Sequence, residues 1–103
     1  MTSLDLGPMR QIFMLFVVRD SLNGVKAISN IKEIFAEHLD AGSYGLEIID
    51  VFESPDLADE NRIVAVPTLL RIQPEPIKRL VGNLSDRLHV CLVLGFQLPP
   101  KED

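Results

Sequence analysis

A strand, a helix and a second strand follow one another within about 40 residues near the start of this chain. Residues 12–18 form a continuous apolar, β-prone run, as expected of a central strand that is covered on both faces. Asp20 or Ser21 can cap the helix that follows, and one face of this helix carries apolar residues at steps of three or four. These residues are Val25, Ile28, Ile31, Phe35 and Leu39. With a second strand over 46–51, the pattern predicts a right-handed βαβ unit with parallel strands.

Shorter elements follow in the second half of the chain. Ser54-Pro55-Asp56 is typical of a helix start, with serine as the cap and proline in the first turn, and predicts a short helix to about Asn61. Strands are expected over 68–72 and 77–81. They are antiparallel because Pro74-Glu75-Pro76 forces a turn between them.

The last segment is ambiguous. Ser85-Asp86 can cap a helix that runs through about Phe96. Residues 88–96 are apolar nearly all round, however, and periodicity cannot separate a buried helix from a buried strand in so short a run.

The order β-α-β-α-β-β-α is that of the thioredoxin fold, with a four-stranded mixed sheet and helices on both faces. We expect one domain over 1–103, with an ordered core over about 11–97 and loose tails at 1–9 and 98–103. Pro67, at the mouth of the third strand, falls where this fold usually holds a structural cis-proline. In redox enzymes of the fold that proline faces a Cys-x-x-Cys pair, but residues 19–24 contain no cysteine. The sequence therefore favours binding over catalysis.

Composition excludes several other classes of function. The net charge of −5 and the pI near 4.9 argue against a nucleic-acid binder, which needs a basic face. Cys91 is the only cysteine and has apolar neighbours, so we expect a buried, inert thiol and neither a disulfide framework nor a four-ligand zinc site. His38 and His89 lack ligand spacing, and no glycine loop suits a phosphate, so we expect no metal and no cofactor.

The apolar run at 12–18 is too short to span a bilayer, and Arg19-Asp20 follows it in place of a cleavage site. We therefore expect a cytoplasmic protein without membrane association.

Four longer motifs stand out in the chain: Leu46-Glu47-Ile48-Ile49-Asp50-Val51, Ser54-Pro55-Asp56-Leu57-Ala58, Arg62-Ile63-Val64-Ala65-Val66-Pro67-Thr68-Leu69 and Gly82-Asn83-Leu84-Ser85-Asp86-Arg87. With these motifs, the chain resembles the KaiB family of circadian-clock and clock-related proteins over about residues 11–97. The resemblance implies a non-enzymatic protein that binds, in a thioredoxin-like state, the amino-terminal ATPase ring of KaiC, a RecA-like ATPase and autokinase. It also implies a second fold, in which the carboxy-terminal half rearranges and the protein forms tetramers.

The chain departs from the clock members of the family at two places. Val93-Leu94-Gly95 stands where they resemble Gly-Leu-Asp, within the segment that would rearrange. Arg19-Asp20-Ser21-Leu22 replaces a Gly-Asn-Thr-Pro-like start of the first helix. The loss of an acid at Val93-Leu94-Gly95 should change the balance between two packings that differ by about a few kcal/mol. We predict that the thioredoxin-like state dominates in this chain.

Candidate contact residues are basic. Arg62, Arg71, Lys78 and Arg79 are expected to cluster around the third and fourth strands of an otherwise acidic chain, where they can steer an acidic partner. A solvated edge strand protected by basic side chains is the alternative. By resemblance, Lys26, Arg62 and Arg79 sit where family members carry basic residues that matter for clock output, and Arg71 and Lys78 are weaker candidates.

Three hypotheses of function follow. The first is a regulatory protein that binds a KaiC-like ATPase in clock or stress-related signalling. The second is a KaiB-like adaptor, or the equivalent of the thioredoxin-like sensor domain of a clock-output histidine kinase, that serves another partner. The third is a residual thioredoxin-like enzyme that uses Cys91. Self-association as a dimer or a tetramer is open.

Overall fold

The computed structural model describes residues 10–98, and the expected tails lie outside this range apart from Leu98. The elements are β1 (Gln11–Val17), α1 (Leu22–His38), β2 (Tyr44–Asp50), α2 (Pro55–Glu60), β3 (Thr68–Gln73), β4 (Lys78–Val81) and α3 (Arg87–Leu94). Their order confirms the thioredoxin-like arrangement that the sequence predicts.

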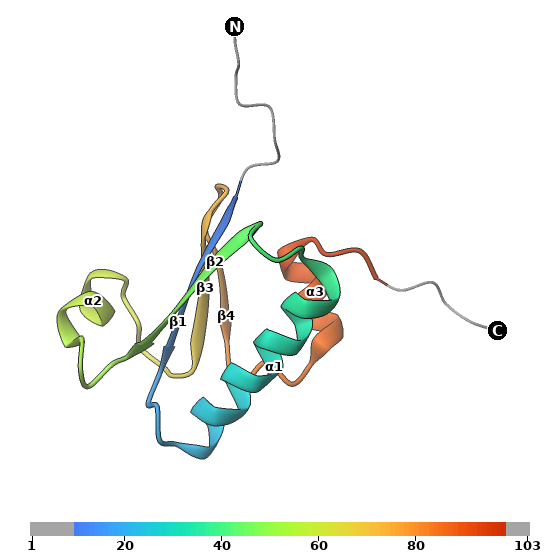
Figure 1. Ribbon diagram of the computed structural model, residues 1–103. Helices are drawn as coiled ribbons and strands as arrows, with labels where there is room; N and C mark the ends of the chain where they lie inside the picture. The colour runs from blue at the N-terminus through green and yellow to red at the C-terminus, as the bar shows by residue number, and fades with distance from the viewer. Residues whose placement is uncertain (1–9, 99–103) are drawn as a thin grey trace, which may run out of the picture.

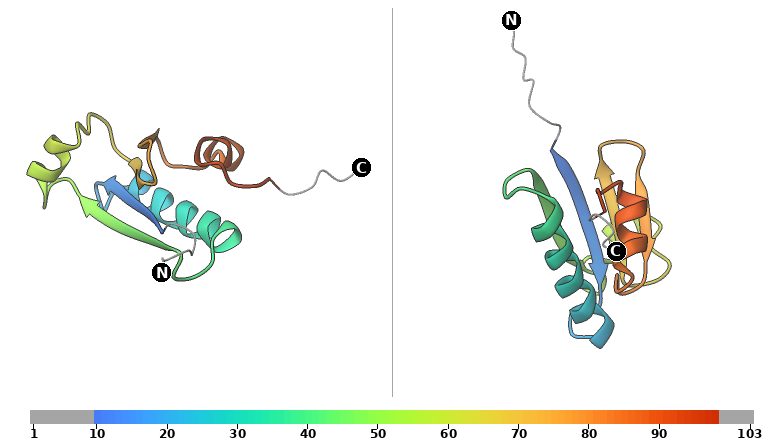
Figure 2. Two further views of the ribbon diagram at one scale, coloured as in Figure 1. Left: turned by 90° about the horizontal axis from the view of Figure 1, so that it is seen from above. Right: turned by 90° about the vertical axis from the view of Figure 1, so that its right-hand side faces the viewer.

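The strands form one four-stranded mixed sheet in the order β2-β1-β3-β4. β1 is parallel to β2 and antiparallel to β3, and β3 is antiparallel to β4. The helices α1 and α3 cover one face of this sheet and α2 covers the other (Figure 1; Figure 2). The predicted βαβ unit and the predicted hairpin are thus both confirmed.

Each face of the sheet carries its own apolar cluster. The larger cluster lies beneath α1 and α3, where the rings of Phe13 and Phe35 pack with their centroids 4.5 Å apart. The smaller cluster lies beneath α2 and consists of Phe16, Ile49, Ala58 and Leu70. β1 supplies residues to both clusters because successive side chains of a strand point to opposite faces.

The first helix begins as predicted but turns a different face to the sheet. The Ser21 hydroxyl accepts a hydrogen bond from the Gly24 N–H at 2.9 Å and donates one to the Val18 carbonyl at 2.7 Å. The cap holds Gly24 so close to the end of β1 that a Cβ atom on this residue would lie 2.4 Å from the Val18 carbonyl oxygen. This close approach determines which face of α1 is turned toward the sheet. The buried residues of α1 are Gly24, Ala27, Ile31, Ile34 and Phe35. The prediction that Val25 belongs to the buried face is therefore wrong, since this side chain is 54% exposed.

Two further details differ from the expectations. β2 begins at Tyr44, two residues earlier than predicted, because Tyr44 pairs with Gln11 and its ring packs against Phe35 at 4.8 Å. Ser54 precedes α2 but makes no side-chain cap hydrogen bond, so the predicted role of its hydroxyl is wrong.

The ambiguous last segment is a helix in this structure. The Asp86 carboxylate accepts a hydrogen bond from the His89 N–H at 3.1 Å and caps α3. Gly95 ends the helix in the left-handed conformation, with φ of 76°. A residue without a Cβ adopts this conformation at little cost. The candidate switch residues Val93, Leu94 and Gly95 therefore form the last turn and the cap of α3.

Within residues 10–98, no helix has the length and apolar character that crossing a membrane requires. The same part of the chain brings no three His, Cys, Asp or Glu side chains together as a metal site would need.

Candidate partner-binding surface

The loops at the carboxyl ends of β1 and β2 meet at one end of the sheet and are tied together by Asp50. Its carboxylate accepts hydrogen bonds from the N–H groups of Arg19, at 3.0 Å, and Phe52, at 2.8 Å. These backbone hydrogen bonds, that from Arg19 first, lower the pKa of Asp50 because they favour its charged form. The Phe52 side chain beside this tie is 78% exposed.

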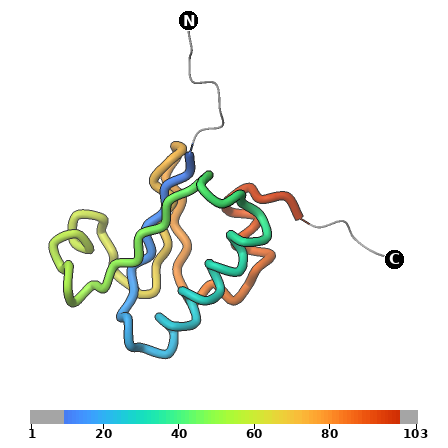
Figure 3. The backbone as a smooth tube through the Cα atoms, in the orientation of Figure 1, coloured from blue at the N-terminus to red at the C-terminus, as the bar shows by residue number. Residues whose placement is uncertain are grey.

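The loop between α2 and β3 reaches the same end of the sheet. In Figure 3 the chain leaves α2, passes through residues 62–67 and enters β3. The Thr68 hydroxyl donates to the Ala65 carbonyl at 2.6 Å, and the Gly82 N–H donates to the Pro67 carbonyl at 2.9 Å. The Val66–Pro67 peptide bond is cis. The base of the loop is thus held against both strands of the β3–β4 hairpin, while Val64 at its tip is 94% exposed.

The edge strand β4 adds its own side chains to this loop. The Arg79 guanidinium donates to the Arg62 carbonyl at 3.4 Å, which places it on the α2 side of the sheet. Val81 shares this face because it lies two residues further along the strand, and its side chain is 63% exposed. We call the exposed set formed by Arg62, Val64, Val66, Arg79 and Val81 the valine–arginine surface.

The predicted basic cluster around β3 and β4 is wrong in part. Arg71 is only 8% exposed, and its guanidinium donates to the Pro76 carbonyl at 3.0 Å. Lys78 is half-buried and points to the α1 and α3 side, the opposite face from Arg79. Adjacent strand residues alternate between faces, so a run of basic residues in β4 cannot form one patch.

Lys26 is exposed on α1, on the far side of the sheet from α2. Of the candidate contact residues, the structure therefore brings together Arg62 and Arg79 and leaves Lys26, Lys78 and Arg71 apart from them.

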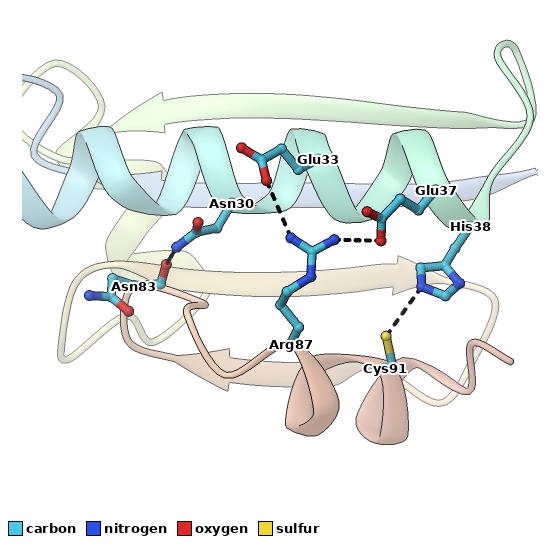
Figure 4. Close-up of polar contacts among 7 residues, drawn as sticks. All are labelled: Asn30, Glu33, Glu37, His38, Asn83, Arg87 and Cys91. Atoms are coloured by element: carbon cyan, nitrogen blue, oxygen red, sulfur yellow. Dashed lines mark hydrogen bonds and ion pairs between the residues drawn. The ribbon is translucent and has the colours of Figure 1, made fainter. Parts of the chain in front are cut away.

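A second polar region, which the sequence did not reveal, joins α1 to α3 (Figure 4). The Arg87 guanidinium forms ion pairs with Glu33, at 3.3 Å, and with Glu37. These contacts, the hydrogen bond to Glu37 first, raise the pKa of Arg87 because they stabilise its charged form. Asn30 donates to the Asn83 carbonyl at 2.9 Å in the same region. We call these contacts, together with the His38–Cys91 contact, the α1–α3 seam.

His38 and Cys91 meet at the other end of this seam. The His38 Nε2 atom and the Cys91 Sγ atom are 3.5 Å apart, and the ring of Phe96 stacks on the imidazole at 5.2 Å. Burial raises the pKa of the Cys91 thiol, in agreement with the expectation of a buried and poorly reactive cysteine. This pairing has no signature in the sequence because the two residues lie 53 positions apart.

Comparison with known proteins identifies a family whose members resemble this chain over most of its length. Residues 14–96 match the KaiB domain. The chain is 40% identical over 85 residues to the circadian clock oscillator protein KaiB of Nostoc punctiforme, with 82% of this chain and 81% of that protein covered. It is 37% identical over 93 residues to the protein of the same name from Trichodesmium erythraeum, with 88% of each covered.

Solved structures agree on the fold. The N-terminal domain of Synechococcus elongatus SasA superposes with a TM-score of 0.72 at 25% identity, and 98% of each chain is covered. Chloroplastic thioredoxin z superposes with a TM-score of 0.67 at 22% identity, with 84% of this chain and 77% of that chain covered, which shows the shared fold alone.

Proposed function

The chain belongs to the KaiB family, and from this premise we propose that it is a regulatory clock-type protein that docks on the ATPase ring of a KaiC-like ATPase. The family match over residues 14–96 is the observation that carries the proposal, since it runs from within β1 to beyond the end of α3. Docking would modulate clock or stress-related signalling without chemistry by this chain.

The start of α1 supports binding in place of catalysis. A thioredoxin-type enzyme needs a thiol pair at this position, but Ser21 caps the helix here and Gly24 packs against Val18. Cys91 lies on α3, far along the chain, and its raised pKa disfavours the reactive thiolate. Equal background activity of the wild type and Cys91→Ser in an insulin-reduction assay is the expected result.

We propose the valine–arginine surface as the docking face. It combines exposed apolar side chains with two arginines in a chain of net charge −5, so it suits a partner that offers an acidic and apolar patch. Lys26, which the resemblance suggests, and Lys78, which the basic residues of the fourth strand suggest, remain proposed contacts at positions outside this surface.

The test is a binding titration with a purified KaiC-like ATPase from the same source. Val64→Glu places an acid on a side chain that is almost fully exposed, so it should leave the fold intact and weaken binding about tenfold or more. Leu92→Glu introduces the same acid at an exposed position of α3 and serves as the matched control, with binding within about twofold of the wild type. Equal affinity of both variants would remove the valine–arginine surface from the proposal.

A second candidate is an adaptor or sensor domain for another partner. The similarity to the N-terminal domain of SasA, with 98% of each chain covered, favours this alternative. Capture of a different protein from the native cell, with no binding to the purified KaiC-like ATPase, would support it.

The oligomeric state and the balance between the two folds stay predictions. A dilute monomer or dimer in size-exclusion chromatography with light scattering would favour the thioredoxin-like state, whereas a tetramer would favour the alternative fold. Amide chemical shifts that report a strand across residues 88–94 would contradict dominance of the thioredoxin-like state.

A further inference from the structure

Arg79 makes two hydrogen bonds that its role as a simple surface charge does not require. Its guanidinium donates to the Asn61 carbonyl at 3.0 Å and to the Arg62 carbonyl at 3.4 Å. Asn61 is the C-cap of α2, so the cation lies at the end of the helix where carbonyl groups lack intrahelical partners. A positive charge is favourable at this end because the helix dipole is negative there.

The loop that begins at this cap is held by backbone hydrogen bonds at its start and by the Thr68–Ala65 hydrogen bond near its end, and Arg79 adds side-chain hydrogen bonds at its start. α2 has only six residues and is far shorter than a helix that is stable alone. Its end is closed by the N–H groups of Asn61, Arg62 and Ile63, which donate to carbonyls of the helix. Arg62 holds a φ of 56°, a left-handed conformation in which a glycine would be favoured. Arg62, with its strained backbone conformation, is therefore the first residue of the exposed part of the loop, and its carbonyl accepts a hydrogen bond from Arg79.

We propose that Arg79 is a positioning residue for the valine–arginine surface. It fixes the end of α2 and thereby presents the Arg62 and Val64 side chains, which make the contact with the partner. The binding part of this inference rests on the proposed function, whereas the ordering of the loop does not. Arginine suits the task better than lysine, because its planar fork can reach two carbonyls at once and an ammonium is a point donor.

The first experiment measures amide hydrogen exchange of the free protein at Asn61, Arg62 and Ile63. Arg79→Met keeps the aliphatic stem and removes the donors, so exchange at these three amides should become about tenfold faster or more. Lys78→Met is the matched control, since this residue is adjacent in β4 and points to the opposite face. Unchanged exchange in Arg79→Met would overturn the positioning role whether or not a partner is found.

The second experiment separates positioning from contact by a double-mutant cycle on binding to the KaiC-like ATPase. Arg62→Gly removes a contact side chain and suits the left-handed backbone, so the loop is retained. If Arg79 acts through Arg62 and its loop, a loss of about tenfold from Arg79→Met in the wild type should shrink to about threefold in Arg62→Gly. An equal loss in both backgrounds would make Arg79 an independent contact and overturn the proposal.

Arg79→Lys separates the geometry of the guanidinium group from its charge, because lysine keeps the positive charge and lacks the planar group with several donors. Faster exchange and weaker binding in this variant support positioning, and wild-type values for both would assign the role to charge alone. Failure of the wild type to bind any KaiC-like ATPase would refute the proposed function, and the exchange result would still decide whether Arg79 orders the loop.

Discussion

Gly24→Ala should destabilise this protein although the residue lies within a helix, where alanine is normally preferred. A Cβ atom on Gly24 would lie 2.4 Å from the Val18 carbonyl oxygen and 2.9 Å from the Ser21 hydroxyl oxygen. Both atoms belong to the turn that starts α1, and the first is backbone, so no side-chain rotation can relieve the contact. The helix must move away from the end of β1, and the Ser21 cap is lost with this movement.

The magnitude follows from three opposing contributions. Alanine gains about 0.8–1.0 kcal/mol over glycine from helix propensity. Loss of the Ser21 cap costs about 1 kcal/mol, and forcing an extra group into a packed site costs about 1–3 kcal/mol. The net effect is a destabilisation of about 1–3 kcal/mol.

Equilibrium urea unfolding followed by far-UV circular dichroism measures this change. Ser29→Ala, at an exposed position of the same helix, is the control and should stay within about 0.5 kcal/mol of the wild type. An unfolding free energy for Gly24→Ala equal to or above that of the wild type would refute the argument that the Val18 contact sets the rotation of α1.

Three further outcomes are expected. Gly95→Ala should lower the unfolding free energy by about 1 kcal/mol because only its left-handed backbone disfavours a Cβ, with open space around it; an unchanged midpoint in urea would contradict this. The pKa of Asp50 is lowered by folding, so its contribution to the unfolding free energy is present above the unfolded pKa of 3.8 and is lost as the pH falls through the folded pKa. Asp50→Asn should therefore flatten the acid side of a plot of unfolding free energy against pH. A slope equal to that of the wild type would show that another group dominates. The pKa of the Cys91 thiol is raised by folding, so its contribution to the unfolding free energy is present below the unfolded pKa of 9.0 and is lost as the pH rises through the folded pKa. Cys91→Ala should remove this part of the loss of stability at alkaline pH. Rapid reaction of the native thiol with a disulfide reagent at pH 8 would contradict its burial.

The sequence was sufficient for features that depend on neighbours along the chain. The apolar run at 12–18, the periodic apolar face of the first helix and the cap and turn signals predicted the order of the elements from β1 to β4, whereas the last segment fitted a helix or a strand. Ser21 was identified as one of two possible caps, and its hydroxyl does cap α1.

Features that depend on close approach were not predictable in this way. The buried face of α1 depends on the contact of Gly24 with Val18, and a periodic pattern that includes Val25 fits the sequence equally well. The burial of Arg71 depends on the Pro76 carbonyl, which is brought near by the turn between β3 and β4. The pairing of His38 with Cys91 depends on how two helices lie side by side.

The valine–arginine surface was likewise predictable only in part from the sequence. The resemblance singled out Lys26, Arg62 and Arg79; the structure places Arg62 and Arg79 together and leaves Lys26 apart on α1. Neither the exposure of Val64 and Val81 nor the capping of α2 by Arg79 has a signature in the sequence, because both arise from the packing of an edge strand beside a loop.

The α1–α3 seam has a consequence for how the chain reaches its final form. Its contacts join residues 50 to 54 positions apart, so Arg87 cannot meet Glu33 until most of the protein has been synthesised. Until α3 has been synthesised, the apolar side of α1 is covered only in part. At about 5–20 residues per second, the ribosome needs several seconds to add the residues between α1 and α3. We therefore expect the docking of α3 to close the fold last and to shield α1 from association with other nascent chains.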